Sequence, residues 1–284
     1  MTFMPAGCMR LIPAAILPLA LAGAGCDIRV DKDGISSVGI MEGRAEDVWT
    51  RTYTLPAGGS LDIRGQNGQI EVEGSSGPQV EVRAEREVHA DSDETARQIL
   101  QKLEIREEVT SSSVKISTTG EESAGGASSF GHRVQARVEY RVRVPAGLAL
   151  TFRTEHGGVR LQDVNGRIAA VTTNGGITGV DVAGSLTAET VNGAIRIDLG
   201  SIAGDVQAKT TNGGIRLTIP RDARVTLEAG VVNGDIAVDR EFGVTLPEGR
   251  NQRLNTPVNG GGPRLSAQSV NGDIRIRARG AAAD

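Results

Sequence analysis

The amino-acid sequence predicts an all-β protein, a β-solenoid with Asn-Gly corners and one short helix in its N-terminal part. The first observation is a motif, Asn-Gly-x-Ile, which recurs at Asn67, Asn165, Asn174, Asn192, Asn212, Asn233 and Asn271. The second is its spacing, because the glycines from Gly157 to Gly213 follow one another in steps of 9, 9, 9, 9, 11 and 9 residues. Such a fixed period is typical of repeat architectures.

The third observation is the alternation of apolar and polar residues after each of these glycines, which predicts short strands with one buried face. Asn precedes Gly only in every second unit, and Ala183 and Ala203 stand in alternate units. One coil therefore contains two strands and two turns, or 18 to 20 residues. A meander of Asn-Gly hairpins is the structural rival, but it gives no reason for every second turn to differ.

The asparagines are expected to stack at one corner of the solenoid. We expect this corner to need a positive φ, which Asn and Gly adopt at least cost. Stacked side-chain amides can then hydrogen-bond from coil to coil, as in the Asn ladders of cross-β stacks. The sequence therefore predicts a ladder formed by Asn174, Asn192, Asn212 and Asn233.

Residues 1–25 have the pattern of a secretory signal, with Arg10 before the apolar run Leu11 to Leu21. This run is shorter than the roughly 18 apolar residues that span a bilayer. Ala22-Gly23-Ala24 suits ordinary signal peptidase, whereas Gly23-Ala24-Gly25-Cys26 resembles the lipobox of bacterial lipoproteins. Cys26 would be the only cysteine of the mature chain, which favours lipidation at Cys26 and a membrane contact through that lipid. Residues 26–50 are then expected to be a tether.

The folded domain is expected over residues 51–284. A short helix is predicted over 92–103, because Ala96, Ile99, Leu100 and Leu103 share one helical face after a cap at Ser92 or Asp93. A strand pair follows, then a Gly- and Ser-rich flexible loop over 118–131 and a long alternating strand from Val134 to Val144. The main repeat array is expected over 144–277.

A longer module surrounds the coils: an apolar residue and Pro precede a strand, and Asn or His follows 11 to 13 residues after the Pro. It begins at Leu55-Pro56, Val144-Pro145 and Ile219-Pro220, and reaches Asn67, His156 and Asn233. From about Tyr53 to Ile276, this arrangement resembles the bacterial putative-adhesin family, cell-envelope domains of largely unknown function. The resemblance implies a right-handed β-solenoid in an exported or membrane-attached protein.

Composition and motifs exclude several classes of function. Seven aromatic residues in 284 and a net charge of −4 argue against a nucleic-acid partner. His89, His132 and His156 are far apart, so no metal site and no cofactor are expected. The carboxylates that a polysaccharide-cleaving solenoid would need could come only from Asp163, Asp181 and Asp198, which we do not place in one column of the repeat. No catalytic residue is predicted.

One row of side chains could bind a ligand. Arg160, Arg196 and Arg216 share the outward place beside the buried column, with Thr178 in the same row. They form either a basic stripe for an acidic glycan or lipid head group, or a solvated face neutralised by Asp198 and nearby acids, and the second interpretation is favoured. The sequence thus predicts a non-catalytic, exported cell-envelope lipoprotein that acts as an adhesin-like binding or scaffolding module for a glycan or an envelope protein. The alternatives are an envelope-stress sensor or regulatory partner and, less favoured, a polysaccharide-active enzyme.

Overall fold

The structure is a computed structural model that describes residues 29–31, 34–36, 42–120, 134–246 and 253–280. It divides into two units, residues 1–40 and 41–284. The first contains an antiparallel pair of short strands, β1 (Arg29–Asp31) and β2 (Gly34–Ser36). The expected signal segment, Cys26 and the loop residues 121–131 lie outside the described residues. The fold described below is that of the second unit.

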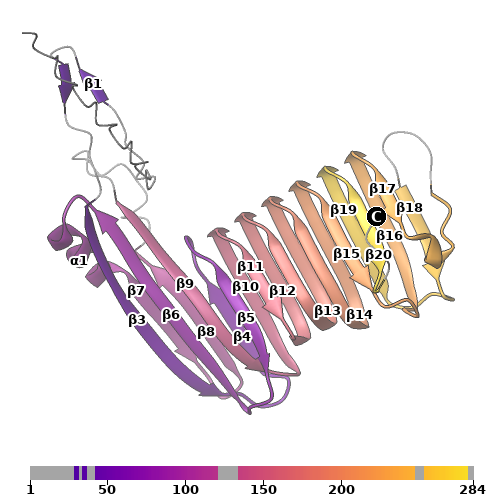
Figure 1. Cartoon of the computed structure of the whole chain (residues 1–284). Coiled ribbons are helices and arrows are strands. Elements are labelled where there is room, and N and C mark those ends of the chain that lie inside the picture. The colour runs from indigo at the N-terminus through magenta and orange to yellow at the C-terminus, as the bar shows by residue number, and fades with distance from the viewer. Residues whose placement is uncertain (1–28, 32–33, 37–41, 121–133, 247–252, 281–284) are drawn as a thin grey trace, which may run out of the picture. The chain divides into compact units, whose positions relative to one another are not determined.

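The second unit is a solenoid of stacked parallel strands with two faces, which we call the threonine face and the arginine face after side chains they carry (Figure 1). In spatial order the threonine face contains β8 (Ser113–Thr119), β4 (Ser60–Arg64), β10 (Leu148–His156), β12 (Asn165–Asn174), the second halves of β13 (Ile177–Asn192) and β14 (Ile195–Asn212), β19 (Arg264–Asn271) and β16 (Val225–Asn233).

The arginine face has the matching strands of the same coils. In spatial order it contains β9 (Gln135–Pro145), β5 (Ile70–Ser75), β11 (Val159–Gln162), the first halves of β13 and β14, β15 (Ile215–Ile219), β20 (Ile274–Ala278) and β17 (Ile236–Val238). Because β13 and β14 bend from one face to the other, the ladder is continuous and forms one 18-stranded sheet. These parallel pairings confirm the predicted β-solenoid and exclude the hairpin meander.

The period of the coil is 18 or 20 residues. Asn174 is in register with Asn192, and Asn192 is in register with Asn212, 18 and 20 residues further along the chain. The register between β13 and β14 shifts near Val182 and again between Gly184 and Leu186, where an irregularity in β14 accommodates the two additional residues. The longer step in the glycine spacing is therefore absorbed at the corner opposite the asparagines.

The order of the coils in space differs from their order in the sequence at both ends. The coil of β4 and β5 lies between that of β8 and β9 and that of β10 and β11. In the same way, β19 and β20 lie between β14–β15 and β16–β17. Antiparallel strands cover both ends, which shortens the exposed parallel edges: β7 (Glu104–Val109), β6 (Gln79–Ala90), β3 (Gly43–Thr54) and β18 (Arg253–Val258).

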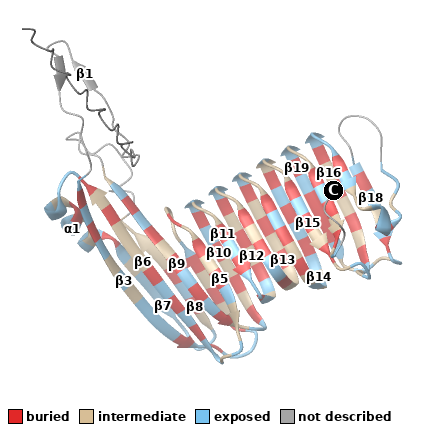
Figure 2. Cartoon of the chain, in the orientation of Figure 1, coloured by how far each residue is buried: buried red, intermediate tan, exposed pale blue. Residues whose placement is uncertain are grey.

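The core lies between the two faces, where the buried apolar residues of each strand stack on their counterparts in the next coil (Figure 2). Aliphatic columns fill it, so that Ile177, Ile195 and Ile215 are each at most 1% exposed. The predicted helix is α1 (Asp93–Lys102), in which the Ser92 side chain accepts a hydrogen bond from the Thr95 N–H at 3.2 Å. Ala96 and Leu103 of its predicted apolar face are fully buried. A short 3₁₀ helix at Arg240–Phe242 was not predicted.

Two expected boundaries need correction. The tether was expected to reach residue 50, but β3 already begins at Gly43 and pairs with β6 along its whole length. This edge strand is largely polar, so its alternation is weak. Residues 118–119, expected in the flexible loop, belong to β8.

The reason given for the Asn-Gly pairs also needs correction. Among the described non-glycine residues, only Asp163, Asp181 and Asn259 have a positive φ, so the stacked asparagines do not need one. The corner glycines do show the expected conformation in part, since Gly157, Gly213, Gly234 and Gly272 have φ between 143° and 157°. Close stacking is a second reason for glycine at this corner. A Cβ on Gly193 would lie 2.0 Å from the carbonyl oxygen of Gly175 in the adjacent coil.

Candidate functional site

A row of outward side chains crosses the arginine face at one level. Arg160 on β11 is in register with Thr178 on β13, and Thr178 with Arg196 on β14. The row continues through Arg216 on β15 to Arg275 on β20. The neighbours of Arg196 in its strand, Ile195 and Ile197, are buried, so the pleat turns the arginine to solvent. Adjacent strands lie about 4.8 Å apart, which places three arginines of this row side by side.

The N-terminal part of this row is neutralised by carboxylates. Glu71 on β5 is in register with both Arg160 and Arg141. Its carboxylate accepts a hydrogen bond of 3.1 Å from Arg160 and lies 3.5 Å from Arg141. Arg141 also pairs with Glu85 at 2.6 Å. Arg160, which the sequence grouped with Arg196 and Arg216, is thus separated from them by Thr178 and held by an acid.

In the C-terminal part of the row, the arginine charges are only partly neutralised by carboxylates. Arg196 and Arg216 form no ion pair with any residue that the structure describes, and Arg275 pairs with Asp273 at 3.1 Å. Asp198, which was expected to neutralise the face, accepts a 3.0 Å hydrogen bond from Arg279 instead. Arg279 also donates to Asp181 at 2.9 Å, and these two hydrogen bonds raise its pKa further above the ordinary value.

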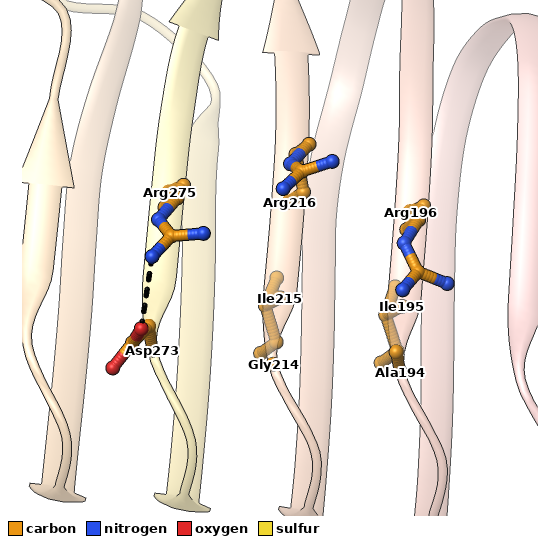
Figure 3. A pocket seen from close by; sticks show the side chains of 8 residues that line it. All are labelled: Ala194, Ile195, Arg196, Gly214, Ile215, Arg216, Asp273 and Arg275. Carbon is orange, nitrogen blue, oxygen red and sulfur yellow. Dashed lines mark hydrogen bonds and ion pairs between the residues drawn. The ribbon is translucent and has the colours of Figure 1, made fainter. Parts of the chain in front are cut away.

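A surface hollow of about 240 Å³ lies among these side chains. Figure 3 shows the guanidinium groups of Arg196, Arg216 and Arg275 side by side on three neighbouring strands, with Asp273 below Arg275. The remaining lining comes from small or aliphatic residues, which leave the guanidinium edges open: Ala194, Ile195, Gly214 and Ile215. Guanidinium groups in this arrangement can donate bidentate hydrogen bonds to carboxylate, sulfate or phosphate oxygens.

The asparagines on the corner of the solenoid form a chain of amide hydrogen bonds. Asn192 donates to Asn174 at 2.9 Å, and Asn212 donates to Asn192 at 2.9 Å. The next member in space is Asn271, which donates to Asn212 at 2.8 Å, and Asn233 donates to Asn271 at 2.8 Å. The structure therefore places Asn271 between two residues that the sequence analysis took as neighbours.

Sequence reasoning missed a second column, which lies on the threonine face two residues before the corner. Each hydroxyl in it donates to the carbonyl oxygen of the corner glycine in the adjacent coil, for example Thr172 to Gly157 at 2.7 Å and Thr190 to Gly175 at 2.8 Å. The members are Thr154, Thr172, Thr190, Thr210 and Ser269, all at most 5% exposed. The signal is present in the sequence as Thr or Ser two places before Asn-Gly or His-Gly.

Two of the carboxylates considered for catalysis, Asp163 and Asp181, lie in turns of the solenoid. Asp163 and Asp181 follow residues that are in register, Gln162 and Val180, so they occupy equivalent places in adjacent coils. This corrects the expectation that they share no column. Both have a positive φ, 54° and 55°, which identifies them as turn residues at the corner opposite the asparagines.

The histidines are not brought together by the described part of the chain. His89 contacts Glu87 at 3.0 Å, and His156 is in register with Asn174. His132 lies outside the described residues. Within those residues there is no group of three or more His, Cys, Asp or Glu side chains arranged to hold a metal ion. No helix among them has the length and apolar character needed to cross a membrane.

Comparisons with known proteins give a family match and distant structural neighbours. The family model described as Toastrack DUF4097 matches residues 53–277. No curated protein sequence matches the chain. A solved structure described as a putative cell adhesion protein from Clostridium sporogenes is 14% identical, with a TM-score of 0.46, over 83% of this chain and 100% of that chain.

Two further solved structures cover a similar share of the chain. A putative adhesin from Bacteroides fragilis is 11% identical, with a TM-score of 0.39, over 82% of this chain and 97% of that one. A putative lipid binding protein from Parabacteroides distasonis is 12% identical, with a TM-score of 0.27, over 81% of this chain and 96% of that one.

Proposed function

The chain belongs to the Toastrack DUF4097 family, and from this premise we propose that it is a non-catalytic binding module of the cell envelope, held to a membrane by a lipid on Cys26. Family membership confirms the resemblance that the repeat motifs predicted. The anchor is supported by the apolar run from Leu11 to Leu21 and by the small residues before Cys26.

The observation that carries the proposal is the continuous outward row on the arginine face. Because five strands of the array are in register, their outward side chains repeat at one strand spacing across the surface. Solenoids offer extended binding surfaces of this kind. An extended envelope component is therefore a better match to the surface than a small molecule in an enclosed cavity.

The non-catalytic part of the proposal is supported by the places of the acids. Asp163 and Asp181 shape a turn, and Asp181 and Asp198 are both held by Arg279. A polysaccharide-active enzyme would require two such carboxylates to face one substrate. Screening glycans for cleavage, with the triple variant Asp163→Asn, Asp181→Asn, Asp198→Asn, tests this; turnover that the variant loses would contradict the proposal.

Localisation and binding are tested separately. Mass spectrometry of the mature protein should find a lipid-modified Cys26 at its N-terminus, and Cys26→Ser should move the protein from the membrane fraction to the soluble envelope fraction. The purified Cys26→Ser chain should bind isolated envelope material. If it binds one envelope protein and no envelope polymer, the rival function of a sensor or regulatory partner replaces this one.

A further inference from the structure

We propose that Arg196, Arg216 and Arg275 bind successive acidic groups of a linear anionic polysaccharide that runs across β14, β15 and β20. The proposal rests on the envelope-binding function above and names the class of ligand. It differs from the stripe expected from the sequence, since Arg160 is excluded by its pairing with Glu71 and Arg275 takes part.

The three arginines form an unfavourable charge pattern. Like charges placed directly opposite each other on adjacent strands destabilise a sheet. Arg196 is in register with Arg216, and Arg216 with Arg275, while one carboxylate, Asp273, lines the hollow beside them. In the other half of the row, Arg160 is in register with Glu71 and Thr178, so no arginine lies opposite it. A local arrangement that costs stability and is only partly compensated, here by the pairing of Asp273 with Arg275, is typical of functional sites.

The cationic site is linear in shape. It has one guanidinium per strand over three strands, so it is a line along the solenoid rather than a round pocket. Thr178 ends the line on one side, and Ala237, in register with Arg275, ends it on the other. A linear polymer with an acidic group on each repeat unit can contact all three arginines at once, and the linked contacts then reinforce one another.

The acids on the arginine face favour a polymer over a membrane surface as the ligand. The same face carries the outward carboxylates Glu71, Glu73 and Asp198, and the whole chain has a net charge of −4. A flat anionic bilayer would meet these acids together with the arginines, whereas a single polymer chain can follow the arginine line alone. The hollow has no aromatic lining residue, so it offers no ring on which a sugar could stack. Charge, rather than stacking, must therefore supply the affinity.

The test uses the full chain carrying Cys26→Ser, so that no lipid contributes to binding. Its affinity is measured for polygalacturonate, dextran sulfate, neutral dextran, monomeric galacturonate and vesicles of phosphatidylglycerol in phosphatidylcholine. The test variant adds Arg196→Gln and Arg216→Gln. The matched control adds Arg153→Gln and Arg167→Gln, which remove the same charge from two exposed arginines of the threonine face that form no ion pair within the described residues. Circular dichroism and thermal melts verify that both variants fold.

We expect the two acidic polymers to bind and neutral dextran not to bind. Affinity for the polymers should fall about tenfold or more in the test variant, because two charge-assisted contacts are lost, and less than about twofold in the control. Galacturonate monomer should bind much more weakly than the polymer, and salt should weaken polymer binding because the arginines are exposed.

Four results would overturn the inference. Equal losses in both double variants would show that net charge acts without a site. Polymer binding unchanged in the test variant would place the ligand elsewhere and leave the envelope-binding function intact. Binding to the vesicles but not to the polymers, lost in the test variant, would identify a membrane surface as the ligand. If the chain binds neither the probes nor the envelope material, the proposed envelope-binding function is contradicted as well.

Discussion

The side-chain amide of Asn271 donates a 2.8 Å hydrogen bond to the amide oxygen of Asn212, although 59 residues separate them in the sequence. Asn233, which is much closer to Asn212 along the chain, donates to Asn271 instead. The strands β19 and β20 are therefore inserted between two coils whose residues come earlier in the sequence, that of β14 and β15 and that of β16 and β17. The C-terminal segment is an internal part of the stack rather than its end.

Replacing Asn212 by Ala should lower the free energy of unfolding by about 1 kcal/mol. The change removes one hydrogen bond donated to Asn192 and one accepted from Asn271, and each is worth ~0.5–1.5 kcal/mol, with water replacing part of it at this exposed corner. Urea denaturation measures the loss. Gln207→Ala, an exposed position on the same strand, should change stability by less than about 0.5 kcal/mol. Equal effects would show that the amide chain contributes nothing.

Thr190→Val should lower the free energy of unfolding by more than its small change in side-chain volume suggests. Its hydroxyl donates to the Gly175 carbonyl at 2.8 Å in a buried position, and an unsatisfied buried acceptor costs ~1–3 kcal/mol. The chain has a natural counterpart in β16, where buried Val231 is in register with Ser269 of the same column. Val231→Thr should therefore be neutral or stabilising. A loss of stability at Val231 as large as at Thr190 would refute the role of the column.

Gly193→Ala should destabilise the protein by about 3 kcal/mol or more, at the upper limit for overpacking. The new Cβ would lie 2.0 Å from the Gly175 carbonyl oxygen, so the coils would have to separate. Gly230→Ala is the matched control, because a Cβ there meets no atom within 4 Å. Thermal melts of the two variants should differ widely, and similar melting temperatures would contradict close stacking as the reason for the glycines.

Stability should fall above pH ~10 because of Tyr53. Burial, followed by a 2.6 Å hydrogen bond donated to Glu107 and the charge of that carboxylate, raises the pKa of Tyr53 above its ordinary value of 10.0. Below this value Tyr53 is protonated in the folded and unfolded states, so its contribution is fully present. Above it, the unfolded state releases the proton first, and the contribution is lost as pH rises toward the folded-state pKa.

Tyr53→Phe isolates this effect. The variant should be about 1 kcal/mol less stable at neutral pH, because it lacks the hydrogen bond, and the difference from the unchanged protein should shrink as pH rises above ~10. Chemical denaturation between neutral and alkaline pH measures both curves. A constant difference over the whole range would mean that Tyr53 does not titrate differently in the two states.

The repeat spacing was sufficient to predict the solenoid, but not the order of its coils. The period of 18 to 20 residues follows from Asn174, Asn192 and Asn212, which are local in the sequence. Asn233 and Asn271 carry the same four-residue motif, so no local pattern says which of them stacks on Asn212. In the structure β18 pairs antiparallel with β16, and β19 lies between β16 and β14, contacts that no local pattern in the motif indicates.

The same ambiguity in the order of the coils limited the prediction of the candidate site from the sequence. Aligning the glycines placed Arg160, Arg196 and Arg216 at one outward level, where the structure also has them. The repeat spacing did not indicate which strands lie next to those of Arg160 and Arg216. Coil insertion at the N-terminal end brings Glu71 against Arg160, and insertion at the C-terminal end brings Arg275 against Arg216. Which half of the arginine row is neutralised therefore depends on the order of the coils in space.

Protection of arginines from chemical modification tests the binding account most directly. The Cys26→Ser chain is treated with phenylglyoxal, with and without polygalacturonate, and modification at each arginine is measured by mass spectrometry. We expect the polymer to protect Arg196, Arg216 and Arg275, while the exposed Arg153 and Arg167 on the threonine face react at unchanged rates. Equal protection on both faces, or none at the three arginines under conditions in which the polymer is bound, would contradict it.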